Sequence, residues 1–181
     1  MKMEVKETPI QGVLLIKPKV FRDERGYFLE AWQKERYEDV GISHPFVQDN
    51  YSKSTKGILR GLHYQKKHPQ GKLIRVPVGE IFDVVVDIRK DSLTFGKWYG
   101  TLLSEDNQCQ LWIPPGLAHG FLVLSEIAHC HYKCTDYYHP EDEGIIRWDD
   151  PILNIQWPVN RPQLSEKDSR APLLSQVIEG L

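Results

Sequence analysis

The chain has 181 residues, with 23 Lys or Arg and 25 Asp or Glu, so its formal net charge is -2. This length fits one domain, residues 1–181, with a sizeable core, and the near-neutral balance argues against a nucleic-acid partner. No apolar run is long enough to span a bilayer, and the N-terminus "MKMEVKETPI" lacks the apolar region of a signal peptide. We therefore expect a cytoplasmic protein with no membrane partner.

Short β-rich runs separated by Gly, Pro, Asn and Asp dominate the chain. In chain order they are residues 12–21, 46–54, 57–65, 72–79, 80–89, 97–104, 108–116, 119–125 and 129–138. Only two stretches have a helical pattern, residues 30–41, which end in a capping Gly41, and residues 170–180 at the end of the chain. Many short antiparallel strands with so few helices indicate a sandwich, a jelly roll or a barrel.

The run "EIFDVVVDIR" places two acids among branched aliphatic residues. Asp83 and Asp87 alternate with Ile81 and Val85 on one face of the expected strand. Such an acid either faces solvent or lines a wet pocket, and the pattern by itself favours solvent.

The three cysteines, Cys109, Cys130 and Cys134, are odd in number and have no C-x-x-C spacing. Structural thiols in a reducing compartment are therefore favoured over a disulfide framework or a zinc ribbon.

Residues 114–121, "PPGLAHGF", contain P-x-G-x-x-H, which resembles the second motif of the cupin superfamily of jelly-roll barrels. Eight strings in fixed order resemble one family of that superfamily, the dTDP-4-dehydrorhamnose 3,5-epimerases, from about residue 9 to residue 174. They are "DERGYFLE", "FVQDN", "LRGLHYQ", "QGKLIRV", "GEIFDVVVDIRKDSLTFG", "LWIPPGLAHGF", "YKCTDYY" and "LSEKD".

The resemblance implies an all-β, cupin-type jelly-roll barrel with a few short peripheral helices. It also implies a homodimer that needs no cofactor and epimerises dTDP-4-dehydro-6-deoxy-D-glucose at C3 and C5, as in dTDP-L-rhamnose synthesis. Both carbons flank the C4 ketone, so each can lose a proton to form an enolate. The reaction then needs a base on one face of the sugar, an acid on the other, and a cation near the enolate oxygen.

His63 is the candidate base, because imidazole titrates near neutrality, and the resemblance makes Asp168 of "LSEKD" its orienting partner. An isolated histidine would more often be an ordinary core or surface residue; its place in "RGLHYQ" favours the catalytic interpretation. Lys72 is the candidate cation that stabilises the enolate, and Arg60 is a candidate to assist it.

Tyr132 is the candidate acid. On the strand "HCHYKCTDYY" it shares one face with Cys130 and Cys134, two small side chains that suit an inward orientation. Without the resemblance, a core tyrosine that only packs would be a close competitor.

Arg60 and His63 are three residues apart, so a regular strand would place them on opposite faces. A bulge at Gly61 would bring both to the cavity.

The nucleotide half of the substrate needs anion donors and a flat site for the base. By resemblance, polar contacts come from Arg25, Glu30, Gln48 and Asn50, stacking from Phe28 and Tyr138, and further contacts from His119, Glu143 and Lys167. Asp83 is a candidate to support these residues from behind. The family builds this site across the dimer, so Arg25, Phe28 and Glu30 are expected to serve the neighbouring subunit.

Three alternatives stay open. A metal-dependent cupin would need the H-x-H of the first cupin motif, which here reads His63-Tyr64-Gln65; His129 and His131 form an H-x-H elsewhere, which we interpret as a surface pair. A non-catalytic sugar-nucleotide binder would not need an acid and a base on opposite faces. An epimerase acting at only C3 or only C5 would use the same residues.

Overall fold

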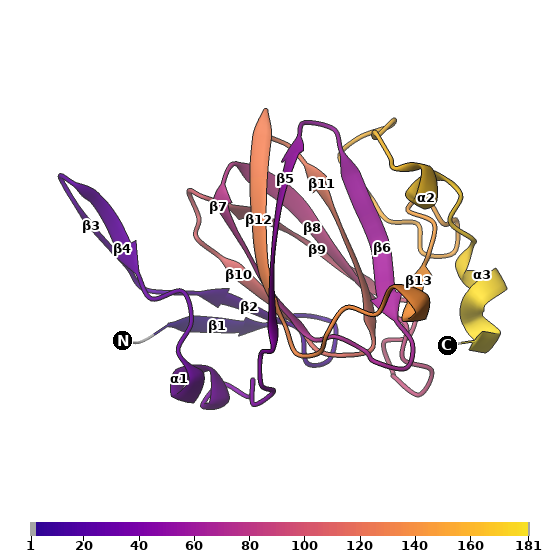
Figure 1. Cartoon of the computed structure of the whole chain (residues 1–181), viewed down its shortest axis with the longest axis horizontal. Helices are drawn as coiled ribbons and strands as arrows, with labels where there is room; N and C mark the ends of the chain where they lie inside the picture. Colours follow the sequence, from indigo (N-terminus) through magenta and orange to yellow (C-terminus); the bar gives the residue numbers. More distant parts are fainter. Residues whose placement is uncertain (1–2, 181) are drawn as a thin grey trace.

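Two antiparallel sheets stacked on each other make up most of the structure, a computed structural model that describes residues 3–180 (Figure 1). The six-stranded sheet has the order β1 (Glu4–Glu7), β2 (Leu14–Lys17), β10 (Gln110–Ile113), β7 (Lys72–Val78), β12 (Ile127–Cys134) and β5 (Gln48–Thr55). The five-stranded sheet has the order β13 (Glu143–Ile145), β6 (Leu59–Gln65), β11 (Leu117–Val123), β8 (Glu80–Asp87) and β9 (Trp98–Ser104). The prediction of an all-β, cupin-type barrel is confirmed.

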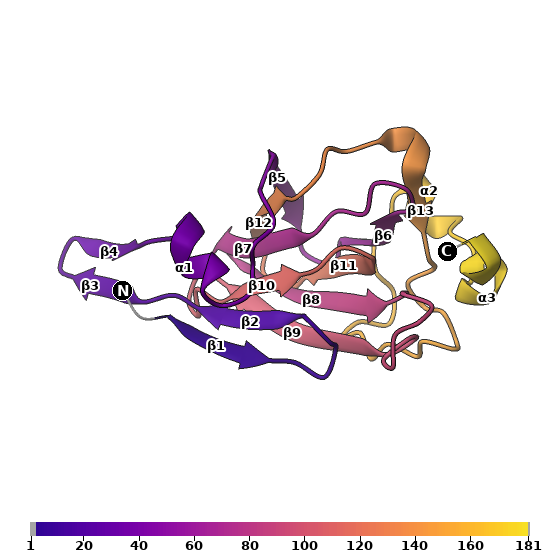
Figure 2. The same ribbon diagram turned by 90° about the horizontal axis from the view of Figure 1, so that it is seen from below.

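A two-stranded hairpin, β3 (Val20–Asp23) and β4 (Gly26–Leu29), projects away from both sheets (Figures 1 and 2). The sequence pattern joined β2 and β3 into a single run and did not predict β1, β4 or β13. The "DERG" turn was correctly placed, since β3 ends at Asp23 and β4 begins at Gly26.

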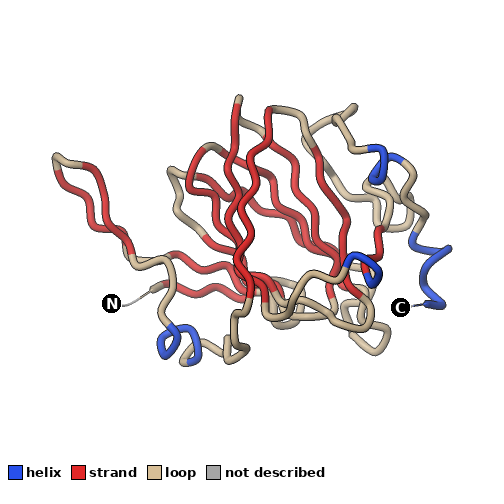
Figure 3. Tube along the Cα trace, in the orientation of Figure 1, coloured by secondary structure: helices blue, strands red, loops and turns tan. Residues whose placement is uncertain are grey.

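Helices are few, short and peripheral (Figure 3). They are α1 (Lys34–Glu38), η1 (Pro140–Asp142), α2 (Glu166–Ser169), α3 (Leu174–Val177) and η2 (Ile178–Gly180). The helix expected over residues 30–41 is reduced to α1, because the side chain of Gln33 caps it by accepting a hydrogen bond from the Arg36 N–H, 2.8 Å away. Gly41 follows it with a left-handed φ of +92°.

Apolar side chains fill three layers. Between the two sheets lie residues of β7, β8, β10, β11 and β12, among them Ile74, Val85, Leu111, Phe121 and Cys130. The C-terminal segment covers the outer face of the five-stranded sheet, and the region of α1 covers part of the outer face of the six-stranded sheet. Burial on both faces explains why several strands lack a clean polar–apolar alternation.

The expectation that the β8 acids face solvent is wrong for both of them, because Asp83 and Asp87 are fully buried. Burial alone would raise the pKa of Asp87, but hydrogen bonds from Arg89, Ser92 and Thr94 outweigh it and hold the pKa at about 2. Asp87 therefore anchors the loop that follows β8. Asp83 lies farther along the same inward face.

The bulge predicted in β6 is confirmed by the pairing with β11. His119 of β11 lies opposite His63 of β6, and Phe121 lies opposite Arg60. The two β6 residues are three positions apart and their β11 partners only two, so β6 contains one extra residue here. Gly61 provides the extra residue, with a φ of +133°, and a Cβ at this position would lie 2.5 Å from the Gly120 Cα. Only glycine accommodates both the backbone angle and the close approach of the strands.

The sequence predicted free structural thiols, with Cys130 and Cys134 on the inward face of their strand. Cys109, Cys130 and Cys134 are free thiols. On β12, Cys130 and Cys134 are buried inside the barrel, whereas His131 and Lys133 point to the outer face. Within residues 3–180, no helix has the length and apolar character needed to cross a membrane.

Candidate active site

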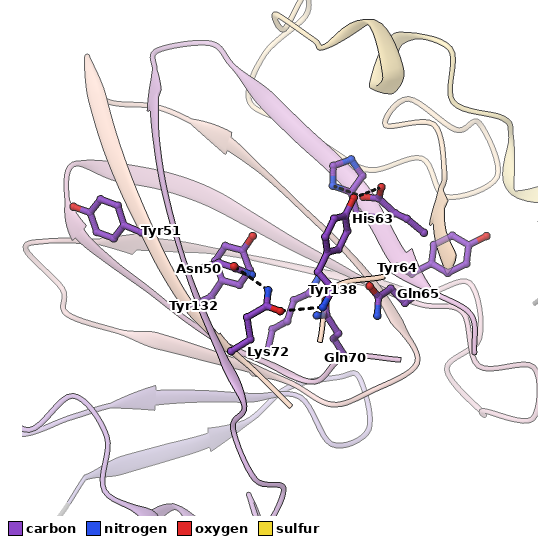
Figure 4. A pocket seen from close by; sticks show the side chains of 11 residues that line it. Asn50, Tyr51, His63, Tyr64, Gln65, Gln70, Lys72, Tyr132 and Tyr138 are labelled. Carbon is purple, nitrogen blue, oxygen red and sulfur yellow. Dashed lines mark hydrogen bonds and ion pairs between the residues drawn. The ribbon is translucent and has the colours of Figure 1, made fainter. Parts of the chain in front are cut away.

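An open cavity of about 330 Å³ lies between β5 and β12 of one sheet and β6 of the other. Its walls are Gln48, Asn50, Tyr51, His63, Tyr64, Gln65, Gln70, Lys72, Tyr132, Tyr138 and Glu143. His63 lies on one side of it, and Tyr132 and Asn50 lie on the other (Figure 4). The fold thus brings together three of the four predicted catalytic residues as cavity walls, and the fourth, Asp168, contacts His63 from behind.

His63 and Asp168 form a close pair in which Nε2 lies 2.6 Å from Oδ1. Asp168 belongs to α2, where Ser165 caps the helix, and it is almost completely buried. Burial alone would raise its pKa, but hydrogen bonds from His63, Ser165 and the Gly61 backbone lower the pKa below its usual range. An ionised Asp168 only accepts hydrogen bonds, so Nε2 carries the proton and Nδ1 is left free to act as a base.

Tyr132 extends from β12 across the cavity from His63. Burial, reinforced by the neighbouring thiols of Cys134 and Cys130, raises the pKa of Tyr132 to about 12. The phenol therefore stays protonated throughout the neutral range and can give up a proton only to a strongly basic partner. A carbanion or enolate carbon is such a partner.

Lys72 begins β7 and lies in the cavity wall. Among the described residues, no carboxylate lies within 4.0 Å of its ammonium group, so the charge is not neutralised by a direct ion pair. Burial lowers the pKa of Lys72. An unpaired ammonium at the cavity wall is suited to stabilising negative charge on a bound molecule.

Amide and aromatic side chains line the part of the cavity nearer β5. Gln48 Nε2 donates a hydrogen bond to Asn50 Oδ1 at 3.0 Å, as expected for residues that share a strand face. The backbone N–H of Tyr138 donates to Gln48 Oε1 at 2.9 Å, and the Tyr138 hydroxyl donates to Glu143 Oε2 at 3.1 Å. These side chains provide hydrogen-bond donors, acceptors and an exposed aromatic ring at the cavity wall.

Arg60 and Lys167 line a second cavity, of about 350 Å³, which also borders on His63 and Asp168. Arg60 Nε donates to Ser54 Oγ at 3.1 Å, and Lys167 forms an ion pair with Glu143. Glu143 Oε1 in turn lies 4.0 Å from His63 Nδ1. Arg60, on β6, and Lys167, on α2, thus place two positive charges in the second cavity, next to His63.

His119, predicted to contact substrate, does not line the main cavity. Its side chain is 9% exposed, and Nε2 lies 2.9 Å from Asp83 Oδ2. Asp83, predicted to support the site, contacts His119 and does not line the cavity itself.

Arg25, Phe28 and Glu30 are remote from the cavity of their own chain. Arg25 and Phe28 lie on the projecting hairpin and border a surface hollow with Phe21, Asp23 and Tyr27. Arg25 pairs with Asp23, and Glu30 pairs with Arg36. Phe28 is 65% exposed, which is unusual for a phenylalanine.

The sequence analysis missed Tyr51, Tyr64, Gln65 and Gln70 as cavity residues. Gln65 was accessible to pattern reasoning, because it stands two residues from His63 on the same strand. It donates to the carbonyls of His68 and Tyr137 and accepts from the His139 N–H, so it ties the loop that carries Tyr138 to β6. Gln70 lies in the turn after β6, where the sequence holds no periodic pattern to identify it.

The outer face of β12 holds the H-x-H pair noted in the sequence. His129 Nδ1 lies 2.5 Å from the Tyr51 hydroxyl, and His131 Nε2 lies 3.5 Å from Asp49 Oδ2. Across residues 3–180, no group of three or more His, Cys, Asp or Glu side chains is arranged to hold a metal ion.

Comparison with known proteins gives a consistent result. A family model described as dTDP-4-dehydrorhamnose 3,5-epimerase matches residues 7–176. The dTDP-4-dehydrorhamnose 3,5-epimerase of Salmonella typhimurium is 54% identical over 179 residues, which cover 97% of this chain and 98% of that protein. The Escherichia coli protein of the same name is 50% identical over 179 residues, covering 97% of each chain.

Two solved structures bound to dTDP sugars have nearly the same fold. A dTDP-6-deoxy-D-glucose-3,5-epimerase from Legionella pneumophila, in complex with dTDP-4-keto-L-rhamnose, has a TM-score of 0.95 at 54% identity, covering 97% of this chain and 95% of that chain. A 3'-monoepimerase from Streptomyces bikiniensis, in complex with dTDP-quinovose, has a TM-score of 0.89 at 32% identity. The match covers 95% of this chain and 88% of that chain.

Proposed function

The chain belongs to the dTDP-4-dehydrorhamnose 3,5-epimerase family, and we propose that it converts dTDP-4-dehydro-6-deoxy-D-glucose to dTDP-4-dehydro-L-rhamnose. The observation that carries this proposal is the placement of His63, with its buried Asp168 partner, opposite Tyr132 in one cavity. A base and an acid on two sides of a bound sugar are what inversion of a carbon requires.

In the first step, His63 Nδ1 takes the proton from C3 or C5. The electrons of the broken C–H bond form a C=C bond, and the carbonyl electrons move to the C4 oxygen, giving an enolate. The ionised Asp168 stabilises the imidazolium that results. Lys72 stabilises the enolate oxygen, because a fixed ammonium in a partly dry cavity is worth more than the same charge in water.

In the second step, the enolate collapses to the ketone and its carbon takes a proton from the Tyr132 hydroxyl on the opposite side. The configuration at that carbon is thereby inverted. Solvent then reprotonates the Tyr132 phenolate and removes the proton from His63. The high pKa of Tyr132 supports this role, since the phenol stays protonated until the enolate carbon accepts its proton.

The nucleotide occupies the rest of the site in this proposal. Tyr138 stacks on the base, Gln48 and Asn50 bond its polar edge, and Arg60 and Lys167 face the diphosphate. The exposed hairpin residues Arg25 and Phe28, with Glu30, complete the site of a second copy in a homodimer. The three free thiols are in keeping with a cytoplasmic location.

An epimerase that acts at a single carbon is the second candidate, since a 3'-monoepimerase shares the fold at a TM-score of 0.89. The same base and acid serve either reaction. The difference would lie in whether the ring turns in the cavity after the first inversion.

Proton NMR of dTDP-4-dehydro-6-deoxy-D-glucose incubated in D2O with metal-stripped protein tests the proposal. We expect deuterium at both C3 and C5 and appearance of the L-lyxo product, and we expect His63→Ala to stop both while dTDP still binds. Deuterium at one carbon only would identify the monoepimerase. Absence of exchange, restored by added metal, would place the chain among metal-dependent cupins instead.

A further inference from the structure

Tyr138, whose ring is proposed to stack on the nucleobase, lies in a segment without regular secondary structure. Residues 135–139 connect β12 to η1, and none of the described strands pairs with them. Tyr138 is 47% exposed, and its ring points toward the side of the cavity that holds His63 (Figure 4). A stacking platform binds tightly only if it is held in place before the ligand arrives. Contacts other than a β-ladder must therefore hold this segment.

Three glutamine side chains supply the hydrogen bonds that a neighbouring strand would otherwise provide. From Asp136 to His139, the backbone is bonded in turn by the side chains of Gln70, Gln65, Gln48 and again Gln65, at 2.9, 3.1, 2.9 and 2.7 Å. The first two backbone groups are carbonyls that accept, and the last two are N–H groups that donate. Four consecutive residues are thus fixed by amide side chains of the barrel and of the turn after β6.

Gln65 holds the residues on both sides of Tyr138. Its Nε2 donates to the Tyr137 carbonyl, and its Oε1 accepts from the His139 N–H. Nε2 also donates to the carbonyl of His68, in the turn after β6, at 2.6 Å. Both N–H groups of the amide are therefore used, and Gln65 is only 7% exposed. Although it lines the cavity, its amide has no donor left for a bound molecule.

The turn after β6 and the segment of Tyr138 also meet through two imidazole rings. His68 and His139 stack with their centroids 4.3 Å apart and their planes inclined by 25°. Gln65 itself is on β6, two residues after His63, and β6 is paired on both sides, with β11 and β13. The strand that carries the proposed base thus also supports the proposed stacking residue.

We propose that Gln65 is a positioning residue for nucleotide binding: by holding the backbone on both sides of Tyr138, it keeps the ring where the base of dTDP stacks. This inference rests on the proposed function, in which Tyr138 contacts the base. Without these bonds the segment adopts other conformations, and the apparent affinity falls in proportion to the fraction of molecules in which the ring is correctly placed. The chemical step is little affected once the substrate is bound.

The test is Gln65→Met, which keeps the length of the side chain and removes all three hydrogen bonds. We expect the Kd for dTDP, measured by calorimetry, to rise roughly 10–100-fold, as for a ring placed correctly in about 1–10% of molecules. The KM for the dTDP sugar should rise with it, while kcat stays within about threefold. A fall in kcat with unchanged Kd and KM would overturn the proposal.

A double-mutant cycle with Tyr138→Ala shows whether Gln65 acts through the ring. Tyr138→Ala alone should raise the Kd for dTDP, and adding Gln65→Met should then have no further effect, because the platform is already lost. Fully additive effects would overturn the proposal. If Tyr138→Ala alone left Kd unchanged, the proposed nucleotide site would itself be wrong, and this inference with it.

Asp150→Asn is the matched control, because Asp150 is a buried side chain that also bonds three backbone groups of its surroundings. It accepts from the N–H groups of Ile152, Leu153 and Leu174, and it does not line the cavity. The variant should lower stability and leave the Kd for dTDP unchanged at a temperature where the protein is folded. A rise in Kd equal to that of Gln65→Met would trace both effects to lost stability and overturn the proposal.

Hydrogen exchange of the unmodified protein needs no substitution. In the absence of dTDP, the His139 amide should exchange much more slowly than in an unfolded peptide, because Gln65 already holds it. Exchange at the rate of an unfolded peptide would overturn the proposal even if Gln65→Met does not fold.

Discussion

At the residue scale, a change at Tyr132 can separate the two halves of the proposed reaction, which are removal of the C3 or C5 proton by His63 and return of a proton by Tyr132. Tyr132→Phe removes only the hydroxyl from a ring that packs against the core between the sheets. Turnover should fall by roughly 10²–10⁴-fold, because a positioned proton donor typically contributes that much. Exchange of the C3 and C5 protons with D2O should persist, since His63 is intact, and NMR of substrate recovered from D2O measures both rates.

The control is His63→Ala, which should abolish exchange and turnover together. If Tyr132→Phe reduced exchange and turnover by the same factor, Tyr132 would not be the acid. The near-identical volume of the two side chains means that loss of packing cannot explain a difference between the rates.

The proposed catalytic residues illustrate what a sequence can predict at this scale. His63 and Asp168 are 105 positions apart, and no local pattern relates them; only the ordered family motifs did so. The alternation of Cys130, Tyr132 and Cys134 correctly placed the phenol inside the barrel. The same rule failed for Asp83 and Asp87, because a strand buried on both faces can hold an acid wherever a partner such as His119 or Arg89 faces it.

At the scale of elements, the bulge in β6 sets the position of His63, the proposed base. Gly61→Ala would put a Cβ 2.5 Å from the Gly120 Cα in a backbone conformation with φ of +133°. We expect a loss of about 2–4 kcal/mol in the free energy of unfolding, from strain and from the displaced strand. Urea denaturation measures this loss, and kcat should fall as well, because His63 lies two residues away.

Gly26 provides the matched control. Its φ of +127° is nearly the same, but no atom lies within 4 Å of an added Cβ. Gly26→Ala should therefore cost only the backbone strain, about 1 kcal/mol. Equal losses for the two variants would show that the contact between β6 and β11 does not require glycine.

Most strands were predictable as elements, because turn residues bound each β-rich run. The helices were less so. The segment 30–41 has helical residues throughout, yet it is held to α1 because Gln33 caps it and Tyr37 is buried against the six-stranded sheet. Helix α2, which carries Asp168, is only four residues long, and so short an element has no periodicity to detect.

At the scale of the whole molecule, the hairpin of β3 and β4 projects away from the two sheets of its own chain (Figure 1). Arg25 and Phe28 border a surface hollow and do not line the cavity that holds His63. Solvent exposure of 65% for Phe28 carries a cost that a second subunit would remove. The family motif "DERGYFLE" singled out these residues in the sequence. That they lie away from the cavity of their own chain could be learned only from the folded structure.

Complementation between two inactive variants tests whether the hairpin serves a neighbouring subunit. One chain carries Arg25→Ala and Phe28→Ala, and the other carries His63→Ala; all three residues are at least partly exposed, so the fold should survive. In a dimer that shares hairpins, the hybrid holds one site with an intact His63 and an intact hairpin. A random 1:1 mixture then contains half hybrids, each with one of two sites restored, which gives about one quarter of the unmodified activity. If each hairpin served its own chain, or if the protein were a monomer, the hybrid would contain no complete site and mixing would restore nothing. Two affinity tags with sequential purification isolate the hybrid, whose activity should reach about one half of that of the unmodified dimer.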